Sequence, residues 1–170
     1  GGPQSSWVGG IEIDTAKTAW FTGAACDIGS GCEEPELFLG TFAIPDAAPT
    51  LLVKDPGVPS AGTSVELVDG LILIGGRYQG ELNLLSEVFP ASSWAVPFVA
   101  AVESSTKDVV WSYPADEDAA SFDPARWKMV VDMAVVGNRE TGSVWVAGCS
   151  APPTAEVLDC ATFEPGKSGF

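Results

Sequence analysis

The chain has 170 residues, of which 46% are hydrophobic, and its 23 acidic and 8 basic side chains give a net charge of −15. The hydrophobic fraction excludes a disordered chain, and the length is enough for one domain with a buried core. The negative charge excludes a nucleic-acid backbone or an anionic membrane surface as partner, because both are negatively charged themselves. It fits a soluble extracellular protein, a cation-binding protein or a protein from a salty environment.

Alternating apolar and polar residues predict β-strands and hairpins along the whole chain, and the 19 glycines and 13 prolines fit the turns between them. In chain order, the predicted elements are a hairpin in GIEIDTAKTAWFTG (10–23), a strand and turn in LLVKDPG (51–57), a hairpin in SVELVDGLILIGG (64–76), two strands in FVAAVESSTKDVVWSYP (98–114) and a hairpin in VDMAVVGNRETGSVWVAG (131–148). The longest apolar run, WAVPFVAAV, contains Pro97 and is far shorter than the ~20 residues of a membrane-spanning helix.

The second strand of each hairpin ends in a shared pattern of large apolar residues, a small residue and a glycine. The three instances are AWFTGAAC, ILIGGRY and VWVAGCS, with the glycine at Gly23, Gly76 and Gly148. The distance between these glycines is near the length of a four-stranded blade with loop insertions. The pattern predicts a single all-β domain over 1–170 with about three repeats, approximately 7–60, 61–125 and 126–170.

The second repeat carries a resemblance to a known family. ILIGGRYQGELNL resembles the VYVTGSFSGTLDL part, and FVAAVESSTKDVVWS the FVAKLDA-x-G-x-x-WS part, of the repeat of secreted bacterial β-propeller proteins. The resemblance covers most of residues 62–113 and is weaker over 7–56 and 130–170. It implies antiparallel four-stranded blades, in a β-propeller or part of one; an open β-sandwich is the alternative.

By the same resemblance, the chain begins and ends inside blades. It is therefore expected to be a segment of a larger propeller, or a protomer that completes its ring with another chain. The start GGPQSSW, without Met, is expected of a mature product or a piece of a longer chain.

Four cysteines lie in two pairs, each just after a motif glycine. Cys26 and Cys32 enclose DIGSG, and Cys149 and Cys160 enclose SAPPTAEVLD. The spacing is not C-x₂-C and the chain has no histidine, which disfavours zinc. Two local disulfides are predicted, with free or metal-bound thiols as the alternative. Disulfides point to an extracellular or cell-surface protein.

The absence of histidine removes the commonest general base and metal ligand, and no nucleophile elbow or phosphate loop is present. We therefore predict a protein that is not an enzyme and has no cofactor. Acidic residues form two clusters, which are Glu33, Glu34 and Glu36, and Asp116, Glu117, Asp118 and Asp123. These clusters predict solvated loops; a Ca²⁺ site, above all at Asp116–Asp123, and carboxylate catalysis are the alternatives.

Ligand contacts are predicted at four residues. Arg77 and Tyr78 belong to RYQG, interpreted as a loop after a strand end, and Trp94 and Trp127 lie near turns or segment edges, as does Trp7. Packing in the core is the alternative for these tryptophans, and it is the prediction for three others that lie in strands, Trp20, Trp111 and Trp145.

Taken together, the sequence predicts a secreted or cell-surface binding or scaffold module that presents loops to a protein or glycan ligand. It is expected to associate with further blades or with copies of itself, and with neither nucleic acid nor membrane interior. A carboxylate-based glycoside hydrolase or lyase and a subunit of a surface filament are the two rival hypotheses.

Overall fold

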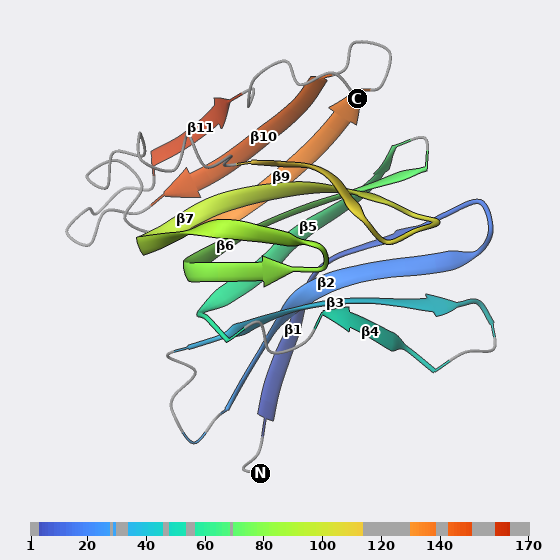
Figure 1. The fold of residues 1–170 in the computed structure, drawn as a ribbon, viewed down its shortest axis with the longest axis horizontal. Helices are drawn as coiled ribbons and strands as arrows, with labels where there is room; N and C mark the ends of the chain where they lie inside the picture. The colour runs from blue at the N-terminus through green and yellow to red at the C-terminus, as the bar shows by residue number, and fades with distance from the viewer. Residues whose placement is uncertain are drawn as a thin grey trace.

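The chain folds into antiparallel β-sheets, seen in the computed structural model of Figure 1. The structure describes residues 4–27, 29, 34–45, 48–53, 57–68, 70–113, 130–138, 143–150 and 159–163, and of Trp94 and of residues 130–163 the backbone alone. Each sheet is made of strands that follow one another in the sequence, so every connection within a sheet joins neighbouring strands. The all-β prediction is confirmed.

The first sheet has the strand order β1-β2-β3-β4. Its strands are β1 (Gln4–Ile13), β2 (Thr18–Asp27), β3 (Glu36–Ala43) and β4 (Thr50–Val53). The β1–β2 turn is held by Asp14, whose Oδ1 accepts a hydrogen bond from the Thr18 amide at 2.8 Å. Short polar side chains favour such turns, which explains the first predicted hairpin. Strand β3 was not predicted.

The second sheet has the order β5-β6-β7-β8 and contains the longest strands. These are β5 (Ser60–Val68), β6 (Leu71–Leu84), β7 (Glu87–Glu103) and β8 (Val109–Tyr113). The prediction of a loop at Arg77–Gly80 is wrong, because these residues lie inside β6. The glycine at the end of RYQG suggested a turn. Gly80 does have φ +98° and lies beside a register shift, but the strand bends there and continues.

The third sheet has the order β11-β10-β9. Its strands are β9 (Val130–Asn138), β10 (Ser143–Ser150) and β11 (Asp159–Phe163). The pairing of β9 with β10 confirms the third predicted hairpin. The register of β10 and β11 places Cys149 directly opposite Cys160.

The three sheets stack in chain order, with the first strand of each next to the first strand of the following one. Strand β1 packs on β5, and β5 packs on β9 (Figure 1). Glycines allow β1 to lie close to β5. A Cβ on Gly9 would lie 2.2 Å from the Gly62 carbonyl oxygen, and a Cβ on Gly62 would lie 1.9 Å from Oγ1 of Thr22. That Oγ1 donates a hydrogen bond to the Phe38 carbonyl at 2.9 Å.

The main hydrophobic core lies between the first two sheets. It includes Trp20, Leu37, Leu39 and Val53 from β2–β4 and, from β5–β7, Val65, Ile72, Ile74, Tyr78, Leu82, Leu84, Phe89, Val96, Phe98, Ala100 and Val102. The Nζ of Lys107, in the β7–β8 turn, lies 4.0 Å from the ring centre of Trp20 and links the sheets by a cation–π contact. Lys107 thereby loses water, and this desolvation lowers its pKa, while the nearby Asp14 carboxylate acts to raise it.

The first two sheets share one local arrangement around their motif glycine. Gly23 of β2 pairs with Phe38 of β3, and Gly76 of β6 pairs with Phe98 of β7. A Cβ on Gly23 would meet the Trp7 carbonyl oxygen at 2.1 Å and the Phe38 ring at 2.6 Å. On Gly76, it would meet the Ala61 carbonyl oxygen at 2.3 Å and the Phe98 ring at 2.6 Å. Each glycine therefore makes room for an aromatic ring.

All three sheets are open, with β1 and β4, β5 and β8, and β9 and β11 as their outermost strands. The described part of the chain accordingly contains no closed barrel and no closed ring of sheets.

We predict that Gly23→Ala and Gly76→Ala destabilise the protein to a similar extent, by about 1–3 kcal/mol each, because each new methyl group overlaps a backbone oxygen and a ring. Equilibrium urea unfolding measures the free energies. The control is Gly29→Ala, since a Cβ there meets nothing nearer than the Asp27 carboxylate at 3.2 Å. Unequal losses at Gly23 and Gly76 would contradict the shared arrangement.

Candidate functional site

One broad face of the first sheet is turned away from the second sheet, and we call it the outer face. Side chains alternate between the two faces of a strand, and directly paired residues share a face. The register therefore places seven large apolar side chains on the outer face, which are Val8, Ile11, Ile13, Phe21, Phe38, Phe42 and Leu51. Val8, Ile11 and Ile13 are 60%, 54% and 56% exposed, and Leu51 is 46% exposed. Contiguous apolar side chains on a protein surface are a feature of interaction sites, so this face is the candidate for one.

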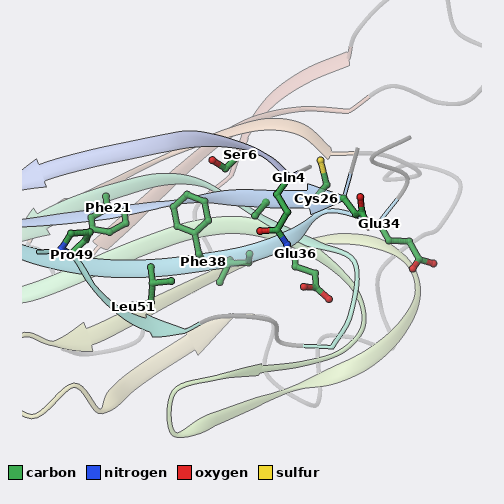
Figure 2. A pocket seen from close by; sticks show the side chains of 12 residues that line it. Gln4, Ser6, Phe21, Cys26, Glu34, Glu36, Phe38, Pro49 and Leu51 are labelled. Carbon is green, nitrogen blue, oxygen red and sulfur yellow. The ribbon is translucent and has the colours of Figure 1, made fainter. Parts of the chain in front are cut away.

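The outer face is hollowed at the end of the sheet where β1 begins. The hollow has a volume of about 620 Å³. It is lined by Gln4, Ser6, Phe21, Ala25, Cys26, Asp27, Glu34, Glu36, Leu37, Phe38, Pro49 and Leu51. Figure 2 shows the apolar side chains Phe21, Phe38, Pro49 and Leu51 toward one end and Glu34 and Glu36 toward the other. Its size is in the range of small-molecule sites.

The floor of the hollow is built by reciprocal packing of two phenylalanines on two glycines. Phe21 of β2 lies over Gly40 of β3, where a Cβ would be 2.4 Å from its ring, and Phe38 of β3 lies over Gly23 of β2. The two rings are 6.0 Å apart between centroids, with planes tilted by 57°. Tilted rings at this distance attract each other, so the floor is a fixed aromatic surface.

The other end of the hollow is negatively charged. Asp27, Glu34 and Glu36 line it, and Oδ1 of Asp27 also accepts a hydrogen bond from the Gly29 amide at 2.8 Å. Glu34 is exposed and Glu36 is half-buried. Cys26, which lines the same end, is disulfide-bonded. A site with an aromatic floor and a carboxylate end matches an apolar ligand that carries a positive charge.

Tyr78, predicted as a ligand contact, is a core residue. Its side chain is fully buried and its hydroxyl donates a hydrogen bond to the Pro90 carbonyl at 2.9 Å. Its ring packs against Phe89 and Phe98, with centroids at 5.8 and 6.2 Å. Desolvation raises its pKa to about 12. The residue therefore stabilises the second sheet and is not accessible to a ligand.

The other predicted contact residues are not brought together with the hollow. Arg77 is half-buried on β6, and desolvation lowers its pKa. The side chain of Trp94 and the whole of Trp127 lie outside the described residues, so their predicted roles stay predictions.

Three of the remaining tryptophans have described side chains. Trp20 is 1% exposed in β2, as predicted for the core, and Trp111 is half-buried in β8. Trp7 is 41% exposed, near the start of β1. The side chain of Trp145 lies outside the described residues, so its predicted packing stays a prediction.

The two predicted acidic clusters have different outcomes. Glu34 and Glu36 line the hollow, and Glu33 lies outside the described residues. The predicted calcium ligands Asp116, Glu117, Asp118 and Asp123 also lie outside them. Within the part that is described, no three His, Cys, Asp or Glu side chains could hold a metal ion together. Nor does any helix there have the length and apolarity to cross a membrane.

The predicted cysteine pairs stay predictions. Cys32, the expected partner of Cys26, lies outside the described residues. For Cys149 and Cys160 the backbone register supports the expectation, because directly opposed residues of antiparallel strands have Cα atoms ~4.5–5.5 Å apart, within the range of disulfides.

Comparison of the chain with protein-family models, with curated proteins and with solved structures found no match.

We predict that alkaline pH destabilises the protein through Tyr78. Its pKa is about 12 in the folded state against 10 when unfolded, so its contribution is complete below pH 10 and is lost as the pH rises toward 12. Tyr78→Phe should lower the free energy of unfolding by about 0.5–1.5 kcal/mol at neutral pH, through the lost hydrogen bond, and flatten its fall above pH 10. Urea unfolding across this pH range measures both effects. A Tyr78→Phe variant whose free energy of unfolding falls above pH 10 as steeply as that of the wild type would contradict this assignment.

We predict that the native chain contains two disulfides formed by its four cysteines. Full reduction should then add the mass of four hydrogens to the intact chain, and peptide mapping should join Cys26 to Cys32 and Cys149 to Cys160. A different pairing, or free thiols that react with iodoacetamide before reduction, would contradict the prediction.

Proposed function

We propose that this chain is a secreted or cell-surface binding module without catalytic activity, and that its outer face receives a protein partner. The hollow takes an apolar side chain of the partner followed by a positively charged group. The single observation that carries the proposal is the aromatic floor of Phe21 and Phe38 next to the carboxylates of Asp27, Glu34 and Glu36.

Long-range electrostatics support the same partner chemistry. The chain has a net charge of −15, so a positively charged segment is attracted before contact, and the carboxylates at one end of the hollow orient it. The rings of Phe21 and Phe38 then remove the apolar part of the segment from water. Burial of apolar surface gives about 25 cal/mol per Å², so affinity comes from the floor and orientation from the charges.

The proposed framework is a set of β-propeller-type blades. Three consecutive sheets stack through their first strands, β1 on β5 and β5 on β9. This arrangement favours propeller-type blades over a two-layer sandwich, because a sandwich consists of two sheets only. A rigid stack of this kind presents a face with fixed geometry, which suits recognition.

The arrangement of the carboxylates favours binding over the glycoside-hydrolase hypothesis. A hydrolase needs two carboxylates on opposite sides of the bond that is cleaved. Glu34 and Glu36 come from one end of the hollow, away from Phe21 and Leu51 (Figure 2), so both would lie on the same side of a bound ligand. They suit attraction of a positive charge.

We predict that phenethylammonium, an aromatic ring with a short cationic tail, binds in the hollow. Its titration into the ¹⁵N-labelled chain should shift the amide signals of Phe21, Phe38 and Leu51, which surround the floor. Glu34→Gln should weaken binding by about twofold to fivefold, the size expected for one exposed charge pair, and added salt should weaken it too.

Glu81→Gln is the matched control, because Glu81 is an exposed carboxylate on β6 and does not line the hollow. It should leave the affinity unchanged. Shifts scattered over all three sheets, or equal effects of the two substitutions, would show that the hollow is not a binding site.

A further inference from the structure

The exposed apolar residues of β1 have counterparts in β5 that are packed in the core. Ile11 pairs with Phe21 and Ile13 with Ala19 across β1 and β2. In the second sheet, Val65 pairs with Ile74 and Leu67 with Ile72. Counted from the motif glycines Gly23 and Gly76, these are the same positions, so Ile11 corresponds to Val65 and Ile13 to Leu67.

The correspondence continues across the sheet. Phe21, Phe38 and Phe42 on the outer face correspond by register to Ile74, Phe98 and Val102, which are fully buried. In the second sheet this face is covered by the first sheet, through Trp20, Leu37, Leu39 and Val53. The outer face of the first sheet thus corresponds to the face of the second sheet that the first sheet covers. No sheet in the described part of the chain covers the outer face itself.

A sheet that follows the same stacking pattern would cover it. The third sheet packs on the second through β9, as the second packs on the first through β5. Among the described residues, the stack thus has two ends, which are the outer face of β1–β4 and the far side of β9–β11. An interface of the kind already formed within the chain would join these two ends if they came from different molecules.

The distribution of charge favours this contact over one between two outer faces. Residues 126–170 carry four of the eight basic and five of the 23 acidic side chains, a net charge of −1, and residues 1–125 carry −14. Two outer faces in contact would bring together the carboxylates of Asp27, Glu34 and Glu36 from both molecules. Strands β9–β11 contain two acidic residues, Asp132 and Asp159, and no basic one, so they bring fewer carboxylates to the outer face than a second outer face would. Three of the basic residues, Arg126, Lys128 and Arg139, lie next to these strands in the sequence and supply the positive charge that the carboxylate end of the hollow attracts.

We propose that the outer face binds the third sheet, β9–β11, of a second copy of this chain, head to tail. This inference rests on the proposed function, since it names the protein partner of the same face. A head-to-tail contact uses different surfaces on the two molecules and produces a ring when the rotation closes or a filament when it does not.

The first test is the mass of the 170-residue chain in solution, by sedimentation velocity over increasing protein concentration. We expect a ring of defined mass or a series of growing oligomers. Association should strengthen between low and moderate salt, because each copy carries −15 and salt screens their repulsion. Ile11→Lys and Ile13→Lys should each weaken association at least tenfold, because they place a charge in the apolar contact.

Val110→Lys is the matched control for these variants. Val110 is 55% exposed on β8, in the second sheet, and is not on the outer face. It should fold and associate like the wild type. Urea unfolding of all three variants verifies that they remain folded.

A mixing experiment tests the direction of the contact. Ile13→Lys blocks the outer face but leaves β9–β11 intact, so this variant should still bind the outer face of the wild type. Native mass spectrometry of ¹⁵N-labelled wild type with unlabelled variant should then show mixed species. Oligomers of the wild type without mixed species would mean that two outer faces pair, which would overturn the head-to-tail assignment.

A monomer at every concentration and salt would overturn the inference. If phenethylammonium still binds the hollow of that monomer, the proposed function stands and its partner is a different protein. If neither association nor binding occurs, the proposed function fails as well.

Discussion

The close approach of β1 and β5 is the constraint on which the rest of the structure depends. Gly9, Gly10 and Gly62 leave no room for a Cβ, so the two backbones meet almost directly and Oγ1 of Thr22 lies against Gly62. This contact fixes the separation of the first two sheets. At that separation Trp20 reaches the core and Lys107 lies over its indole. Wider spacing would leave cavities around Trp20, which cores tolerate poorly.

The same contact determines which face of the first sheet is not covered by the second sheet. Because β1 turns its glycines toward β5, the side chains of Ile11 and Ile13 lie on the opposite face, together with Phe21 and Phe38. The outer face is therefore apolar for the same reason as the corresponding face of the second sheet. The second sheet has apolar residues on both faces and is packed on both, and the first sheet has the same pattern.

Much of the fold could be predicted because its signals are local. Alternation and turn residues identified three hairpins, including the one closed by Asp14. Strand β3, ELFLGTFA, was missed because Leu37, Phe38 and Leu39 are apolar in succession and give no alternation. Its glycine, Gly40, receives the ring of Phe21, a tertiary contact that the sequence does not reveal. Gly80 misled the prediction for a related reason, since it bends a strand that continues.

The candidate site was harder to predict, because it is made by register and not by sequence proximity. Glu34 and Glu36 stood out as acidic residues, but nothing local connects them to Phe21 on another strand. Tyr78 followed a motif glycine and suggested an exposed loop, whereas its face of the second sheet is covered by the first sheet.

Residues of the same type at corresponding positions therefore differ in their burial. Phe98 is buried and Phe38 is half-buried, although each pairs with a motif glycine at the corresponding position. The difference comes from what lies on top of each sheet, and a strand's own sequence does not encode that. Burial in a stack of similar units is a property of the position in the stack. The end of such a stack consequently exposes apolar side chains whose counterparts in an inner unit are buried, and its shape suits another unit of the same kind.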